Sequence, residues 1–390
     1  MKDTIIKEIC EILNIKKEQV ENTLKLLEEG ATVPFIARYR KEKTGALNED
    51  EIRKINEYYE YQVNLFKRKE DVIRLIEEKG LLTEDLKNEI LKAEKLIEVE
   101  DLYRPFKEKK KTKATDAINN GLEPLAKIIM SFPTKGNIDD IVNKYLNEKV
   151  KTKEEALEGS SYIIAEWISD NAYYRKEIRN FIYKNGSVVS KVKKDAQDEK
   201  KTYEMYYDFN ESVKYIKHYR VLAINRGEKE KILTVNIDFN EEEVYAYLNK
   251  KIIKDSTSFV VKVVEDAIKD SCKRLIFPSI EREIRSELTQ KADKLAIETF
   301  GVNLEHLLLT RPIKGMVVLG FDPGYVNGCK LAVVDKNGCY LDSCVIKPFL
   351  KNANEAALVE SKIIVKNLIE KYNVDIISIG NGTASRESES

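Results

Sequence analysis

The chain has 390 residues, of which 42% are hydrophobic, so it is long and apolar enough to build two or three domains with sizeable cores. Lysine plus arginine and aspartate plus glutamate number 67 each, which gives a formal net charge of zero. This balance excludes a globally basic nucleic-acid-binding chain and an acidic disordered tail, so any charged binding surface must come from local clustering.

Apolar residues recur at helical spacing through the first part of the sequence. Residues 83–85 (Thr-Glu-Asp) have the character of a capped helix start, and Gly30 and Gly186 are stop signals. We therefore predict a helical N-terminal domain over residues 1–186. Its main helices are expected at residues 5–13, 20–27, 48–80, 83–99 and 153–183.

The next segment differs in composition. Residues 187–202 are polar, charged and poor in large apolar groups, which predicts a hinge. A central helical region is expected over residues 203–313, interrupted by a short hairpin near residues 220–237. Within it, residues 279–300 have a strong amphipathic pattern that indicates a helix closed by Gly301.

From residue 314 onward the pattern becomes that of a mixed α/β domain. Strands are expected at residues 317–321, 330–335, 340–346 and 374–379, with a helix at 353–372 before the last strand. A four-stranded sheet with one covering helix leaves a face bare. We therefore expect residues 314–390 to be an incomplete α/β domain that follows mainly α-helical N-terminal and central regions.

The first unusual stretch covers residues 30–45. Pro34 can begin a short helix from which Arg38, Arg40 and Lys41 project, and these cations could contact phosphates. The alternative is a corner between helices whose arginines pair with neighbouring glutamates. Taken from the residues alone, the corner is favoured, because runs of charge are usually solvated faces.

A second stretch, residues 101–115, is the best local candidate for phosphate contact. Between residues 104 and 113 it has six basic residues against one acid, Glu108, and Tyr103 and Phe106 lie among them where they could stack on bases. An exposed loop without a binding role is the equal alternative. The basic residues are Arg104, Lys107, Lys109, Lys110, Lys111 and Lys113.

The third candidate is Asp322, which closes the first predicted strand of the α/β domain. RNase H-like folds place a first metal-binding aspartate there and use further acids on neighbouring strands to hold two Mg²⁺ ions. The matching position on the fourth strand offers Asn381, and the nearest acids are Glu387 and Glu389. We therefore favour a turn or helix-cap role for Asp322.

Other chemistry has little support in the sequence. The five cysteines form no CxxC pair and only two histidines are present, which argues against a zinc site. Phosphate-binding glycine motifs are absent, so we expect no cofactor and no metal. No segment approaches the ~18 apolar residues of a membrane span. The expected setting is a reducing cytoplasm, without membrane contact.

Together these stretches resemble the Tex family of bacterial transcription accessory proteins. They occur in the family's order over almost the whole chain. The resemblance implies helix-turn-helix-like elements in the N-terminal region, a central helical region and a YqgF-like, RNase H-like domain within which this chain stops. The stretches that carry it are ATVPFIARYRKEKTGAL (31–47), VEDLYRPFKEKKKTKAT (99–115), GLEPLA (121–126), FPSIEREIRSELTQKAD (277–293), VLGFDPGYVNGCKLAVVD (318–335) and IGNGTASRESE (379–389).

The function that this resemblance implies is a scaffold that binds RNA or DNA without sequence preference, acts on transcription and catalyses no reaction. Two alternatives stay open. One is a Mg²⁺-dependent nuclease or resolvase that uses Asp322. The other is a protein-interaction scaffold that docks on the transcription or translation machinery through its helical faces.

Overall fold

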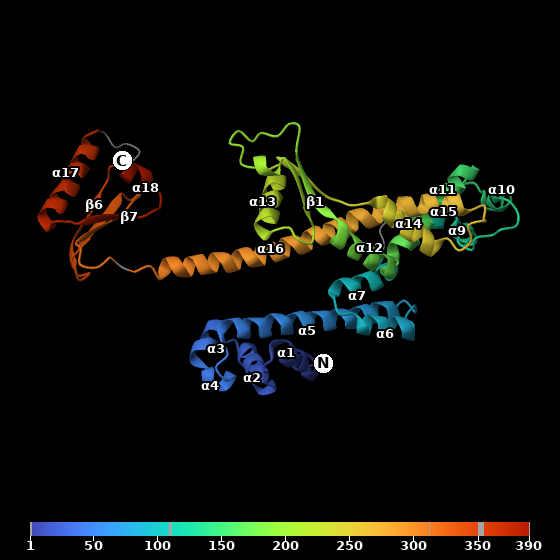
Figure 1. Cartoon of the computed structure of the whole chain (residues 1–390), viewed down its shortest axis with the longest axis horizontal. Coiled ribbons are helices and arrows are strands. Elements are labelled where there is room, and N and C mark those ends of the chain that lie inside the picture. Colours follow the sequence, from blue (N-terminus) through green and yellow to red (C-terminus); the bar gives the residue numbers. More distant parts are fainter. Residues whose placement is uncertain (1, 109–110, 312, 350–354, 390) are drawn as a thin grey trace. The chain divides into compact units, whose positions relative to one another are not determined.

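The computed structural model describes residues 2–108, 111–311, 313–349 and 355–389 (Figure 1). The chain divides into two compact units, residues 1–297 and residues 298–390. No helix among the described residues is long and apolar enough to cross a membrane.

The N-terminal part of the first unit is a group of helices packed against α5 (Figure 1). Asn48 begins α5 with reciprocal hydrogen bonds: its side chain accepts from the Glu51 backbone N–H at 2.9 Å, and the Glu51 carboxylate accepts from the Asn48 N–H at 2.8 Å. Ile9, Ile36 and Ile55 are among the fully buried core residues. The helices are α1 (Lys2–Leu13), α2 (Lys17–Glu28), α3 (Val33–Tyr39), α4 (Lys41–Thr44) and α5 (Glu49–Glu77).

Ile90 and Val99 pack with Ile76 of α5 in a small separate core. The helices after residue 112 share one large hydrophobic core that includes residues on both sides of position 186, from Ala114 to Ile284. The predicted helix at 83–99 is two helices, because the chain turns between Lys92 and Leu96. The elements are α6 (Glu84–Lys92), α7 (Leu96–Tyr103), η1 (Arg104–Phe106), α8 (Lys113–Asn119), α9 (Glu123–Ile129), α10 (Ile138–Val142), η2 (Asn143–Tyr145), α11 (Lys153–Asp170), α12 (Ala172–Asn185), η3 (Glu204–Tyr206), α13 (His218–Lys229), α14 (Glu241–Ile252) and α15 (Val261–Asp270).

A three-stranded antiparallel sheet follows α12, in the order β2-β1-β3. Its strands are β1 (Ser187–Val192), β2 (Asp208–Ser212) and β3 (Leu233–Asp238). The predicted hinge over residues 187–202 is therefore wrong for its first six residues, because β1 is paired on both edges. The hairpin expected at 220–237 is also wrong: its first half lies in α13, and only its second half is a strand.

A long helical run closes the first unit. It passes from α15 through one π-helical stretch, η4 (Ser271–Ile276), into α16 (Phe277–Leu308). Pro278 has no backbone N–H to donate to the preceding turn, and the N–H of Phe277 bonds five residues back, to the Cys272 carbonyl. The helix expected at residues 279–300 is present, but Gly301 does not end it, since α16 continues to Leu308.

The second unit contains a mixed four-stranded sheet in the order β6-β5-β4-β7, with β4 and β7 parallel. The strands are β4 (Val318–Asp322), β5 (Cys329–Val334), β6 (Tyr340–Ile346) and β7 (Ile376–Ile379), and the helices are α17 (Glu355–Tyr372) and α18 (Ser385–Glu389). Leu368 of α17 packs with Leu319 and Leu331 of the sheet. Val345 of β6 and Ile377 of β7 are exposed, so part of the sheet is not covered by the described helices. The predicted fold class, helical regions followed by an α/β domain, is confirmed.

Three helices of the first unit meet at a buried cluster of charges, which we call the arginine cluster. It consists of Asp101 from α7, Arg175 and Arg179 from α12, and Ser279 and Glu283 from α16 (Figure 1 shows α7, α12 and α16). The Arg175 side chain is 0% exposed and that of Asp101 is 6% exposed. The cluster thus joins helices that are distant in the sequence.

Every carboxylate of the arginine cluster is shared between two guanidinium groups. Arg175 Nε donates to Asp101 Oδ1 at 2.6 Å, and its Nη2 donates to Glu283 Oε1 at 2.5 Å and to Ser279 Oγ at 3.0 Å. Arg179 Nη2 donates to Asp101 Oδ2 at 2.6 Å and to Glu283 Oε2 at 2.9 Å. Burial alone lowers the pKa of Arg179, but these two carboxylates raise it overall. The guanidinium of Arg179 therefore stays charged.

Replacing Arg175 by alanine should lower the free energy of unfolding by about 3–5 kcal/mol, because Asp101 and Glu283 would remain buried without this cation. Urea unfolding followed by the fluorescence of Trp167, the single tryptophan, measures the change. Lys262→Ala is the control: it breaks an exposed ion pair with Asp266 and should cost at most about 1 kcal/mol. Equal midpoints for the two variants would contradict the prediction.

Candidate nucleic-acid interface

The predicted phosphate-binding stretch, residues 104–113, is called the basic segment below, and its first residues pack against the helical unit. Tyr103 is buried, with the Arg68 guanidinium 5.4 Å from its ring centre, and Phe106 packs against the same hydrophobic cluster. Lys79 Nζ donates to the Phe106 carbonyl at 2.6 Å. The expectation that Tyr103 stacks on bases is therefore wrong, because its ring is buried in the core, and Phe106 is partly buried against the same cluster.

Three lysines of this segment lie on the surface. Lys107 and Lys111 are exposed, and Lys113 begins α8 with its side chain in solvent. Lys111 Nζ lies 3.9 Å from the Asp116 carboxylate, and both side chains are solvated. These lysines can reach phosphate oxygens without breaking a buried contact. Lys109 and Lys110, also predicted to bind phosphate, lie outside the described residues.

Lys113 belongs to a small group of cations around one tyrosine. Its Nζ lies 4.4 Å from the ring centre of Tyr162 on α11 and donates to the Tyr162 hydroxyl at 3.0 Å. The guanidinium of Arg274, in the π-helical stretch, lies 5.3 Å from the same ring. This ring holds two cations close together, although like charges repel. Tyr162 of α11 and Arg274 of η4 are therefore spatial neighbours of the basic segment.

Arg104 differs from the lysines that follow it. Its side chain is half-buried, and its Nη2 lies 3.4 Å from Ser279 Oγ, beside the arginine cluster. Burial lowers the pKa of Arg104, and the neighbouring Arg175 cation lowers it further. Arg104 is therefore directed into the helical unit, while Lys107, Lys111 and Lys113 are exposed.

The N-terminal candidates Arg38, Arg40 and Lys41 lie on α3, α4 and the residue between them. Arg38 is exposed, with its Nε 3.5 Å from the Glu49 carboxylate. Arg40 Nη1 donates to the Tyr39 carbonyl at 2.9 Å, and Lys41 is exposed. The predicted corner between helices is present, but only Arg38 of the three pairs with a glutamate among the described contacts.

Asp322 ends β4, where the parallel neighbour β7 ends one residue before Gly380. The side chain of Asp322 is exposed, and the Gly380 N–H donates to the Phe321 carbonyl at 2.8 Å. Glu387 is engaged elsewhere, since its carboxylate accepts from the Tyr325 hydroxyl at 2.7 Å. Two-metal hydrolysis needs several carboxylates around the ions. Among the described residues, no three His, Cys, Asp or Glu side chains gather in that way.

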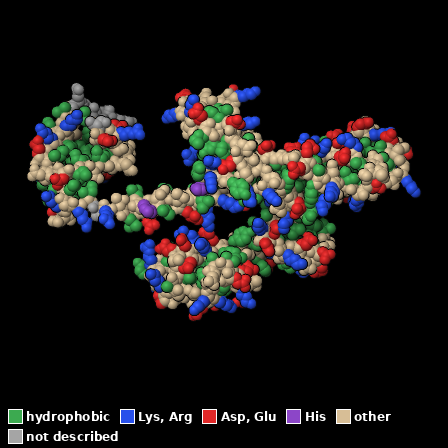
Figure 2. All heavy atoms as spheres, viewed as in Figure 1, with side chains coloured by type: hydrophobic (Ala, Val, Ile, Leu, Met, Phe, Trp, Pro, Cys, Tyr) green, Lys and Arg blue, Asp and Glu red, His purple; other side chains and the backbone are tan. Residues whose placement is uncertain are grey.

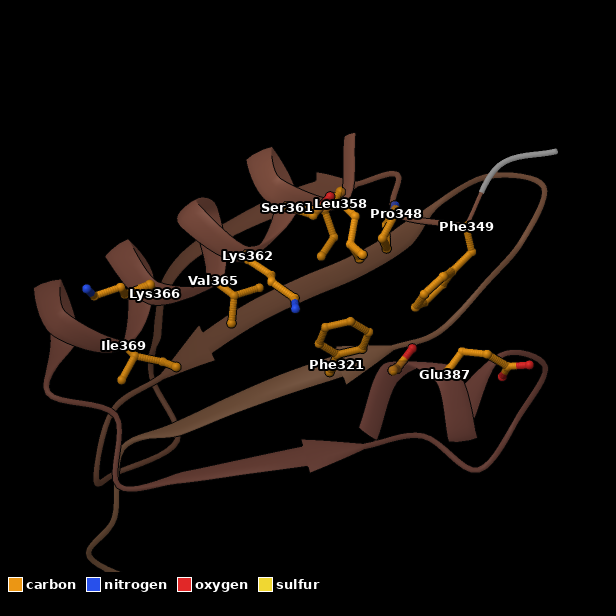
Figure 3. Close-up of a pocket in the computed structure, with 12 residues that line it drawn as sticks. Phe321, Pro348, Phe349, Leu358, Ser361, Lys362, Val365, Lys366, Ile369 and Glu387 are labelled. Carbon is orange, nitrogen blue, oxygen red and sulfur yellow. The ribbon is translucent and has the colours of Figure 1, made fainter. Parts of the chain in front are cut away.

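A pocket of about 560 Å³ lies in the second unit, between α17 and the sheet. Figure 3 shows Phe321 pointing from the sheet into this pocket, toward Val365 and Leu358 of α17. Most of its lining is apolar, and the charged lining residues are Lys362, Lys366 and Glu387. Asp322 does not line it. This pocket therefore provides apolar packing surface more than reactive groups.

Basic and acidic side chains are intermixed over the visible face of the helical regions, as the balanced composition requires (Figure 2). Sequence reasoning missed two features of the candidate surface: Tyr162 with Arg274, and an exposed aromatic pair, Phe35 and Tyr39, on α3. The aromatic pair could have been predicted from helical spacing. Ile36 and Ala37 point inward, so residues 35 and 39, one turn apart, share another side of α3.

Comparison with protein families gives three consecutive matches along the chain. The Tex-like protein N-terminal domain matches residues 3–77, and the Tex central region matches residues 135–300. The YqgF-like domain of Tex proteins matches residues 316–390. The last two matches begin close to positions where the structure changes: α10 begins at Ile138, and β4 begins at Val318.

Individual proteins match over nearly the whole chain. Protein YdcI of Bacillus subtilis is 49% identical over 100% of this chain and 54% of its own length. The transcriptional accessory protein Tex of Neisseria gonorrhoeae is 34% identical over 95% of this chain and 49% of its own length. The human S1 RNA-binding domain-containing protein 1 is 31% identical over 99% of this chain and 39% of its own length. The chain spans about half the length of these two bacterial relatives and a smaller share of the human one.

The contrast between Arg104 and Lys107 predicts different effects on nucleic-acid binding. Lys107→Met should reduce the slope of log affinity against log salt for single-stranded RNA by about 0.7, the value for one phosphate contact. Arg104→Met should leave the slope unchanged, because its guanidinium faces Ser279. Fluorescence anisotropy at several salt concentrations measures both slopes. A smaller slope for the Arg104 variant alone would show that the assignment is reversed.

Proposed function

The chain belongs to the Tex family, and from this premise we propose that it binds nucleic acid as a non-catalytic accessory scaffold in transcription. The observation that carries the proposal is the exposed position of Lys107, Lys111 and Lys113 on a chain with no net charge. The names of the relatives support it, since one is a transcriptional accessory protein and another carries an S1 RNA-binding domain.

Lysines on a solvated segment contact phosphates without reading bases. Such contacts fix the position and orientation of the nucleic acid, and they carry no sequence information. The Lys111–Asp116 pair at 3.9 Å contributes little in solvent, so a phosphate can replace the carboxylate at small cost. Arg274, beside Lys113 at Tyr162, lies on the same surface, where its guanidinium pairs with the Asp270 carboxylate. We therefore propose binding without sequence preference.

Arg38, Arg40 and Lys41 supply a second group of cations on the N-terminal helices. Two groups on one chain would let it hold a nucleic acid at more than one place, and two linked weak contacts bind more tightly than either alone. We propose that the setting of this binding is the cytoplasm and that components of the transcription or translation machinery are the protein partners.

Changing Lys107, Lys111 and Lys113 together to alanine should weaken binding to single-stranded RNA and flatten its salt dependence. Three lost phosphate contacts correspond to a decrease of about 2 in the slope of log affinity against log salt. Fluorescence anisotropy of the 390-residue chain with labelled single-stranded RNA, titrated against salt, measures it.

The matched control removes three exposed lysines that pair with acids one helical turn away: Lys127, Lys262 and Lys291. This control has the same net charge as the test variant, so it separates a local contact from the overall field of the protein. Equal slopes for the two triple variants would remove the basic segment from the proposal. Failure of the unaltered chain to bind at low salt would refute the binding function for these residues.

A further inference from the structure

The short helix α3 presents two aromatic side chains to solvent. Tyr39 is 63% exposed and Phe35 is 40% exposed, and their ring centres lie 5.4 Å apart with the planes tilted by 46°. Ile36 and Ala37 bury the other side of the helix in the N-terminal core. Large aromatic groups that stay exposed beside a completed core are typical of binding surfaces.

A cation holds this pair in place. The Arg40 guanidinium lies 5.0 Å from the ring centre of Phe35, and its Nη1 donates to the Tyr39 carbonyl at 2.9 Å. Three planar groups, two rings and one guanidinium, are thus ordered together on the surface before any ligand binds. An ordered surface loses less conformational entropy on binding than a mobile one. We call Phe35, Tyr39 and Arg40 the aromatic platform.

The surroundings of the aromatic platform are basic. Exposed Arg38, Lys41 and Lys43 adjoin it in the sequence, and Glu42 is the one acid between residues 31 and 48. The Arg38–Glu49 contact is long, at 3.5 Å, and both side chains are solvated, so it leaves the arginine available. This charge pattern complements a polyanion. Rings next to such cations fit a polyanion that also offers flat, unstacked groups.

We propose that the aromatic platform binds an unpaired stretch of RNA, with a base stacked on Tyr39 and phosphates held by Arg38 and Lys41. This inference rests on the proposed nucleic-acid-binding function and adds a preference for single strands. In a duplex each base is already stacked between its neighbours, so it cannot stack on a side chain. The lysines of the basic segment contact phosphates of either form. The platform is therefore the part of the chain that distinguishes them.

The test uses the whole chain and two labelled probes, a single-stranded RNA of about 12 nucleotides, within the usual footprint of such sites, and the duplex of the same sequence. Tyr39→Ala should bind the single strand about tenfold more weakly and leave the salt slope unchanged, because no charge is removed. Duplex affinity should stay the same. Tyr39→Phe should bind as the unaltered chain does, since stacking needs the ring and not the hydroxyl.

Tyr340→Ala is the matched control, because this tyrosine of β6 is 66% exposed and its hydroxyl lies 2.9 Å from Ser343 Oγ. It should change neither affinity. Unchanged single-strand binding by Tyr39→Ala, with normal binding by the unaltered chain, would overturn the platform and leave the proposed function standing. An equal loss for both probes would also overturn the preference for single strands. If the unaltered chain binds neither probe, the proposed function and the platform both fail.

Discussion

The arrangement of the helical unit depends on the buried guanidinium of Arg175. It is 0% exposed and bonds to carboxylates on two other helices, one from α7 and one from α16. Removing such charges from water costs several kcal/mol for each ion, and hydrogen-bonded pairing with carboxylates offsets that cost. Nε and Nη2 of Arg175 are paired in this way, while its buried Nη1 makes no hydrogen bond with the described residues. The three helices must therefore meet with Asp101, Ser279 and Glu283 in place. The cluster therefore restricts how α7, α12 and α16 align, because a shift of one helix would leave a buried charge unpaired.

The arginine cluster also divides the cations of the basic segment into one that lies beside it and others that are exposed. Asp101 and Arg104 stand three residues apart at the end of α7, and the first is part of the arginine cluster while the second lies beside it. Lys107, Lys111 and Lys113, by contrast, are exposed side chains outside the cluster. Within one sequence motif, Asp101 and Arg104 therefore stabilise the fold, whereas the exposed lysines that follow can contact a ligand.

Local signals were enough to predict the long helices and the succession of strands and helix along the last domain, because caps, turns and periodicity lie within a few residues of the element they define. The same reasoning missed β1, whose mixed polar sequence becomes a strand only through pairing with β2 and β3. It also missed the arginine cluster, in which Arg175 reaches partners 74 and 108 residues away. Tyr103 and Phe106 looked like stacking groups because sequence alone does not show which aromatic rings are buried.

The neutrality of the chain has a consequence for how it could hold nucleic acid. A protein with no net charge exerts little long-range attraction on a polyanion, so binding depends on contacts made at short range. Lysine–phosphate contacts weaken as salt rises, because releasing the counterions of the nucleic acid into a more concentrated salt solution gains less entropy. Stacking on Tyr39 carries no such penalty. A chain that combines Lys107 and its neighbours with the aromatic platform would therefore retain single strands at salt concentrations that release duplexes.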